Sequence, residues 1–101
     1  MGQGVQLAIE SGIACIRLDD GKVNAMSSAL LGEIDEALGA AERAGAVVVL
    51  RGREGILFAG FDLPTFQRGP AASVPMVRAG AELVVRLLAF PRPVLAVCTG
   101  H

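Results

Sequence analysis

Apolar and polar positions alternate at the start of the chain. Val5, Leu7 and Ile9 are separated by smaller or more polar residues, and a period of two is typical of a half-buried strand. Residues 10–12 (Glu-Ser-Gly) supply a turn, after which residues 13–18 resume the apolar pattern. We therefore predict a β-hairpin over these segments.

The next segment has the period of a helix. Residues 19–21 (Asp-Asp-Gly) end the hairpin with turn residues. Ser27 or Ser28 is placed to cap a helix by accepting hydrogen bonds from its first N–H groups, and Gly45 is a natural stop. Between them, apolar residues recur every three or four positions at Leu30, Leu31, Ile34, Leu38 and Ala41. This spacing predicts an amphipathic helix.

Two short apolar runs follow this helix. Residues 46–50 form a valine-rich run, which is typical of a strand that is covered on both faces. After a polar loop, residues 56–59 (Ile-Leu-Phe-Ala) are interpreted as a further strand, which breaks at Gly60. Residues 63–70 are expected to be irregular, because they end in the strong turn signal Gly-Pro.

The last part of the chain predicts a second helix and a final strand. Ser73 is a candidate cap, and Pro75 then falls in the first turn, where its missing N–H costs nothing. Residues 90–93 (Phe-Pro-Arg-Pro) stop the helix, and residues 94–98 form another apolar strand. The stripe expected to be buried consists of Val77, Gly80, Leu83, Val84, Leu87 and Leu88.

The predicted order of elements is β-β-α-β-β-α-β. A strand–helix–strand succession implies parallel crossovers, so the fold class is α/β with layered sheet and helices. A ββα unit occurs twice, and a third unit begins with the strand at residues 94–98. Residues 1–101 show no linker and are expected to belong to a single domain.

The composition is unusually apolar for a chain of this length. Apolar residues make up 52% of 101 residues, and 13 glycines add to them; the usual share for that combined set is about 45–50%. A chain this short buries only about 60–65% of the surface of its unfolded form. We therefore expect the chain to be part of a larger core or to pack against a partner subunit.

Charge and cysteine usage exclude several classes of protein. The net charge is −1 and the nine Lys and Arg residues are scattered, so no nucleic-acid footprint is present. No apolar run approaches the ~18 residues of a membrane span, and the first residues lack the pattern of a secretory signal. We expect a soluble, cytoplasmic protein in which Cys15 and Cys98 are reduced core thiols and no metal is bound.

One segment contains a candidate catalytic group. The chain has no P-loop, no zinc-binding HExxH, no CxxC and no GxSxG motif. In residues 58–63 (Phe-Ala-Gly-Phe-Asp-Leu), however, a strand is interrupted by Gly60. Such a break can leave the N–H of Phe61 free to stabilise a developing oxyanion. The alternative is an ordinary turn in which Asp62 bonds locally, and the residues alone leave both open.

The chain resembles the enoyl-CoA hydratase/isomerase (crotonase) family. The similarity covers nearly the whole chain, in register and in order, but only the N-terminal part of that family's domain. It is carried by the segments GKVNAM (21–26), VVVLRG (47–52), LFAGFDL (57–63), FPRPVLAV (90–97) and TGH (99–101). The resemblance implies a crotonase-like spiral of ββα units, truncated after the third unit begins.

The resemblance also implies site residues. The N–H of Phe61 would be the first of two backbone donors to the thioester oxygen, at a position where the family often has alanine. Ala59 and its neighbours Gly60, Asp62 and Leu63 would line the path of the bent CoA. Lys22 would contact a CoA phosphate, although a solvated turn lysine is an equal alternative. For Asp62 we expect a structural role rather than proton transfer.

The implied activity is that of an acyl-CoA enzyme, a lyase or isomerase of fatty acid metabolism. The favoured reaction is syn hydration of a trans-2-enoyl-CoA; alternatives are enoyl-CoA isomerisation, another crotonase-type reaction, or a non-catalytic acyl-CoA-binding or assembly subunit. CoA would enter as part of the substrate, with no further cofactor. The second oxyanion donor and the acid/base glutamates are expected beyond His101, so the fragment alone should be nearly inert. A homo-oligomer, as a trimer or a dimer of trimers, is also expected, and an unrelated α/β interaction domain is a remote alternative.

Overall fold

The described part of the chain folds into four strands and three helices. The structure is a computed structural model that describes residues 4–101. The elements in chain order are β1 (Val5–Glu10), β2 (Ile13–Leu18), α1 (Ser28–Arg43), β3 (Val47–Arg51), α2 (Leu63–Gln67), α3 (Pro70–Ala89) and β4 (Val94–Val97).

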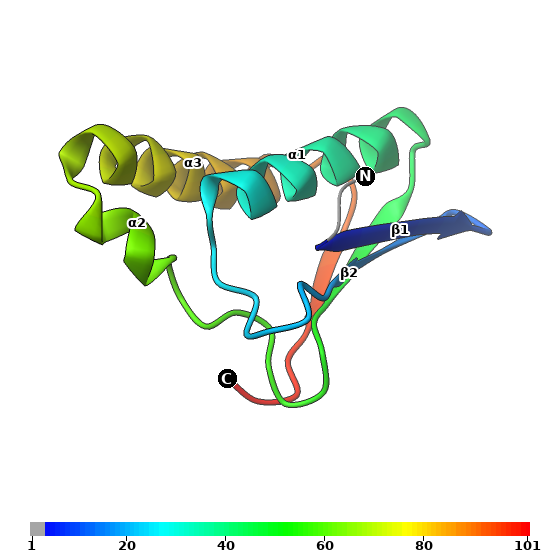
Figure 1. The fold of residues 1–101 in the computed structure, drawn as a ribbon. Coiled ribbons are helices and arrows are strands. Elements are labelled where there is room, and N and C mark those ends of the chain that lie inside the picture. The colour runs from blue at the N-terminus through cyan, green and yellow to red at the C-terminus, as the bar shows by residue number, and fades with distance from the viewer. Residues whose placement is uncertain (1–3) are drawn as a thin grey trace.

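The strands form one mixed sheet in the order β1-β2-β3-β4. β1 and β2 are the antiparallel hairpin predicted from the alternation, with Val5 opposite Leu18. β2 pairs with β3, and β3 with β4, in parallel, as the intervening helices require. The helices α1 and α3 pack against each other and lie together on one side of the sheet (Figure 1). The prediction of an α/β fold is therefore confirmed.

The core lies between α1, α3 and the inner face of the sheet. Ile16 and Leu18 of β2, Ile34 and Leu38 of α1 and Met76 of α3 are fully buried there. The start of α1 is fixed by Ser27, whose side chain accepts a hydrogen bond of 3.1 Å from the Leu30 N–H. The predicted helix and the first of its two candidate caps are thus confirmed.

The strand predicted at residues 56–59 is wrong. This segment has no continuous ladder; it makes one isolated bridge, from Ile56 to Arg53, and a second, from Phe61 to Met26, follows it. Its other partners are single groups, such as the carbonyl of His101, which accepts from the Leu57 N–H at 2.7 Å. The segment passes between two loops rather than beside a strand. Its backbone N–H and C=O groups therefore form hydrogen bonds with separate partners instead of with one neighbouring strand.

Two helix boundaries also differ from the prediction. Residues 63–67, expected to be irregular, form α2, which follows Asp62 and has Pro64 in its first turn. The helix α3 begins at Pro70 rather than after Ser73, because proline is favoured at the first helical position and Gly69 serves as the N-cap. Consequently Pro75 lies inside α3, where it removes one helical hydrogen bond.

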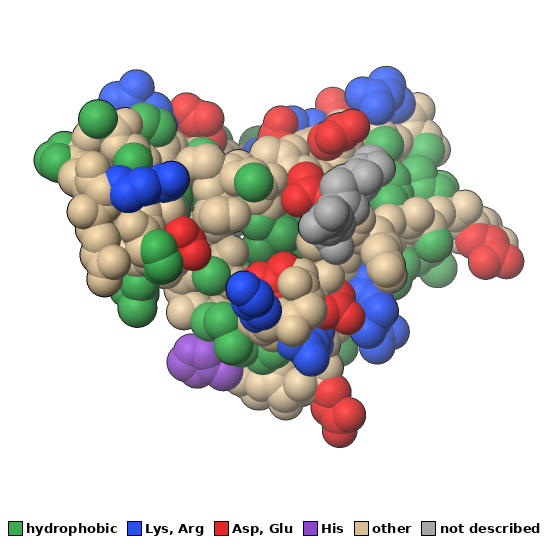
Figure 2. All heavy atoms as spheres, in the orientation of Figure 1, with side chains coloured by type: hydrophobic (Ala, Val, Ile, Leu, Met, Phe, Trp, Pro, Cys, Tyr) green, Lys and Arg blue, Asp and Glu red, His purple; other side chains and the backbone are tan. Residues whose placement is uncertain are grey.

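Much of the apolar excess remains on the surface. In α3 the residues Met76, Gly80 and Leu83 are buried, but Val84 is 56% exposed and Leu88 83%, so the predicted stripe is only partly buried. Figure 2 shows further hydrophobic side chains on the surface where α2 and the start of α3 lie. Both cysteines are unpaired, as expected, but Cys15 is only partly buried and Cys98 is exposed, so the prediction that they lie in the core is wrong.

Candidate active site

The loop between β2 and α1 is held by one buried side chain, that of Asn24. Its backbone has a φ of +55°, in the left-handed region where asparagine is favoured over most other residues. Its Oδ1 accepts from the Asp20 N–H at 3.0 Å, and its Nδ2 donates to the carbonyls of Leu18 at 2.8 Å and Leu57 at 3.2 Å. Asn24 therefore ties this loop to the segment that leads to Phe61.

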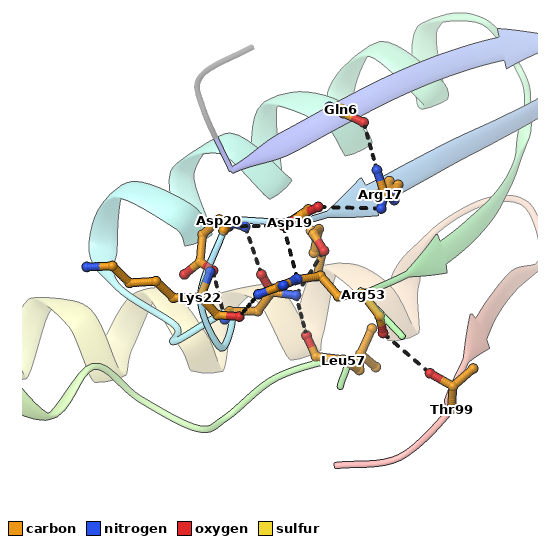
Figure 3. Close-up of polar contacts among 11 residues, drawn as sticks. Gln6, Arg17, Asp19, Asp20, Lys22, Arg53, Leu57 and Thr99 are labelled. Atoms are coloured by element: carbon orange, nitrogen blue, oxygen red, sulfur yellow. Dashed lines mark hydrogen bonds and ion pairs between the residues drawn. The ribbon is translucent and has the colours of Figure 1, made fainter. Parts of the chain in front are cut away.

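Polar contacts on the outside of the loop fix the backbone of Lys22. The Asp20 carboxylate accepts from the Lys22 N–H at 2.7 Å, and the Arg53 guanidinium donates to the Lys22 carbonyl. Arg53 is itself paired with Asp19, with Nε and Oδ1 3.3 Å apart. The side chain of Lys22 extends away from these contacts (Figure 3). Its backbone is thus anchored, while its ammonium group is available to a ligand.

The peptide between Gly60 and Phe61 has a defined direction. Its carbonyl accepts from the Met26 N–H at 2.8 Å, and the next N–H, of Asp62, donates to the Met26 carbonyl at 3.2 Å. In a trans peptide the C=O and N–H point in opposite directions, so the Phe61 N–H points away from Met26. None of the hydrogen bonds among residues 4–101 is donated by this N–H. Gly60, with a φ of +88°, allows the backbone to turn here.

A hollow of about 490 Å³ lies beside this peptide and the Lys22 loop. The structure brings five of the six predicted site residues to this hollow, and Gly60 lies between two of them. The lining residues are Asp20, Lys22, Val23, Ala25, Ser27, Ala59, Phe61, Asp62, Leu63 and Pro64. Its walls combine apolar side chains with one cation and two carboxylates, which suits a ligand that is partly apolar and partly charged.

A second hollow, of about 470 Å³, lies along α3. Only Phe61 lines both hollows. The lining of the second is entirely uncharged and consists of Met26, Phe58, Phe61, Val77, Gly80, Ala81, Leu83, Val84 and Leu87. Sequence reasoning placed the α3 residues of this set, except Ala81, in a packing stripe and did not identify any of them as site residues. In the sequence these residues form a run of apolar positions around a glycine. The spacing of such a run does not show whether the residues pack in the core or line a groove.

Asp62 is engaged in local structure. Its Oδ2 accepts a hydrogen bond of 2.6 Å from the Thr65 hydroxyl, and its carbonyl accepts from the Thr65 N–H at 3.2 Å. It immediately precedes α2, where a carboxylate interacts favourably with the first turn. These contacts agree with the structural role expected for Asp62.

The arrangement offers one backbone donor, the Phe61 N–H, that has no partner among residues 4–101 and belongs to a residue that lines both hollows. Such a donor stabilises negative charge on a carbonyl oxygen, and in well-studied enzymes its removal costs about 3–4 kcal/mol. Within residues 4–101, no group of three or more His, Cys, Asp and Glu residues is placed to hold a metal ion. The same part of the chain has no helix long and apolar enough to cross a membrane.

Comparison with known proteins identifies the family. The model of the enoyl-CoA hydratase/isomerase family matches residues 8–101. The chain therefore belongs to this family, and the alternative of an unrelated interaction domain is removed. A probable enoyl-CoA hydratase of Bacillus subtilis (strain 168) is 27% identical over 100 residues, which are 95% of this chain and 39% of that protein.

Solved structures agree with this assignment and with the crotonase-type fold. An enoyl-CoA hydratase/isomerase family protein from Pseudomonas syringae matches with a TM-score of 0.93 and 35% identity, over 97% of this chain and 43% of its own. An enoyl-CoA isomerase of Mycobacterium tuberculosis matches with a TM-score of 0.92 and 36% identity, over 100% and 44%. The chain thus spans less than half the length of these relatives, which are named as a probable hydratase, a hydratase/isomerase family protein and an isomerase.

Proposed function

We propose that this protein acts on acyl-CoA thioesters and that the Phe61 N–H stabilises the negative charge that develops on the thioester oxygen. The observation that carries the proposal is the direction of the Gly60–Phe61 peptide, whose carbonyl is held by Met26 while its N–H is free among the described residues. Family membership supports the class of substrate. Because the donor is fixed before substrate binds, it needs no reorganisation when charge develops.

The favoured reaction is syn addition of water to a trans-2-enoyl-CoA. The water oxygen bonds to C3 and a proton is delivered to C2, so that the thioester passes through an enolate-like state and nothing leaves. Double-bond isomerisation passes through a related enolate and is the alternative. Both need a second oxyanion donor and acid/base groups, which the proposal places outside residues 1–101. CoA enters as part of the substrate, and no further cofactor is needed.

The reaction is tested by giving the intact protein a trans-2-enoyl-CoA and a 3-enoyl-CoA in separate assays. A hydratase removes the ultraviolet absorbance of the conjugated thioester, whereas an isomerase creates it from the 3-enoyl substrate. Binding of both thioesters without turnover supports the non-catalytic alternative. Absence of binding contradicts the proposal altogether.

Lys22 is expected to bind CoA through a phosphate. Replacing Lys22 with methionine keeps the apolar stem and removes the charge, so the Kd for CoA should rise about fivefold at low salt and less at high salt, as for an exposed ion pair. Isothermal titration calorimetry with free CoA measures this. Arg92→Met, which removes an exposed cation far along the chain from this loop, is the matched control. An unchanged Kd for the Lys22 variant would show that Lys22 is a solvated turn residue that does not bind CoA.

Homo-oligomerisation is proposed on the strength of the exposed apolar surface. Val84 and Leu88 of α3 and Leu95 of β4 are all more than half exposed, which is unfavourable unless further protein covers them. A trimer or a dimer of trimers is the assembly expected from the resemblance. Light scattering on the intact protein distinguishes these states from a monomer.

A further inference from the structure

The ring of Phe61 occupies a space that exists only because residue 80 is glycine. A Cβ added at Gly80 would lie 2.6 Å from Cζ and 2.7 Å from Cε1 of Phe61, closer than carbon atoms approach without a shift. Gly80 is buried in the interior of α3, where glycine is unfavourable relative to alanine. Glycine at this position is therefore explained by the close approach of the Phe61 ring.

A second aromatic residue holds the same ring from α2. The rings of Phe61 and Phe66 are perpendicular, with an interplanar angle of 87° and centroids 6.4 Å apart. This edge-to-face geometry is a favourable one for aromatic pairs. The ring is thus in contact with both helices that follow Phe61 in the chain.

The backbone and the side chain of Phe61 are consequently held by two different parts of the chain. Met26 holds the flanking peptide groups, with hydrogen bonds to the Gly60 carbonyl and from the Asp62 N–H, and Gly80 receives the ring. The preceding residue, Gly60, gives the peptide rotational freedom that these two anchors restrict. A change at either anchor would turn the Phe61 N–H.

We propose that Gly80 is a positioning residue for the Phe61 N–H: by admitting the Phe61 ring into α3, it fixes the direction of the donor that meets the thioester oxygen. This inference rests on the proposed function and adds to it a residue of α3 that acts through the Phe61 ring. Alanine at position 80 would push the ring, and with it the peptide, out of place. The same alanine would be harmless in a protein that lacks the ring.

The test uses the intact protein and butanoyl-CoA with ¹³C at the thioester carbonyl, a saturated ligand that does not react. A hydrogen bond from the Phe61 N–H lowers the carbonyl stretching frequency, which isotope-edited infrared spectroscopy reports. We expect Gly80→Ala to lose at least half of this shift and to lower kcat about ten- to a hundredfold with little change in KM, as for a small misplacement. The double variant Phe61→Ala/Gly80→Ala should recover the shift and kcat of Phe61→Ala alone.

Gly32→Ala in α1 is the matched control, because nothing lies within 4 Å of an added Cβ there, and it should behave as the parent protein. If Gly80→Ala fails to fold, Phe61→Ala removes the ring from its contact with Gly80 and should lose part of the shift. A full shift in either folded variant overturns the inference and leaves the proposed function intact. No shift in the parent protein overturns the proposed function itself.

Discussion

Replacing Phe61 with proline should lower kcat for enoyl-CoA turnover about 10²–10³-fold, the usual effect of losing one oxyanion donor. Proline has no N–H, so the substitution removes the donor itself. The Gly60 carbonyl, which accepts from the Met26 N–H at 2.8 Å, remains available to position the peptide. Steady-state kinetics on the intact protein, with the folded fraction checked by circular dichroism, give the result.

Phe61→Ala is the matched control for this substitution, because it removes the ring and keeps the N–H. Its kcat should fall less than about tenfold, since the donor and its anchors on Met26 remain and only the contacts with Gly80 and Phe66 are lost. Equal losses in the two variants, with the carbonyl shift of bound butanoyl-CoA unchanged in Phe61→Ala, would show that the side chain, and not the N–H, acts on the substrate. That outcome would refute the assignment of the oxyanion donor.

The sequence predicted those elements whose pattern is local. The β1–β2 hairpin follows from strict alternation, and α1 follows from a long apolar stripe between Ser27 and Gly45. The error at residues 56–59 arose because an apolar run shows the need for burial but not the partner. That segment is satisfied instead by Asn24 and by the carbonyl of His101, contacts with distant parts of the chain that no local pattern displays.

The candidate site was found from the sequence only in part. Residues 57–63 gave a glycine break and a family motif, and the structure places Lys22 near them because Asn24 bridges the two segments. Neither the apolar hollow along α3 nor the seat of the Phe61 ring on Gly80 was predicted. Both depend on how far α3 lies from residue 61, which is set by tertiary packing rather than by the spacing of residues within the helix.

Replacing Asn24 with alanine should lower the free energy of unfolding by about 4 kcal/mol. Asn24 is fully buried, and alanine would leave the Leu18 and Leu57 carbonyls and the Asp20 N–H without the partners they now have. Because only the bond to the Leu18 carbonyl is fully buried and the other two are partly buried, each lost partner costs about 1 kcal/mol, the low end of the range for a buried unsatisfied group. The φ of +55° adds strain for alanine. Urea unfolding of the intact protein, followed by circular dichroism, measures the change.

Asn24→Gly separates the two causes, because glycine accepts a positive φ but has no amide. Its free energy of unfolding should be about 1–2 kcal/mol higher than that of Asn24→Ala. This difference is the cost of the left-handed conformation for a residue with a Cβ. Equal stabilities of the two variants would show that backbone strain contributes nothing. Stability within 1 kcal/mol of the parent in both would mean that the three hydrogen bonds of Asn24 do not hold the loop.

The same two variants should also bind CoA more weakly than the parent, because the loop that Asn24 holds presents Lys22. An affinity below that of Lys22→Met would show that the position of the whole loop, and not only the charge of Lys22, contributes to CoA binding.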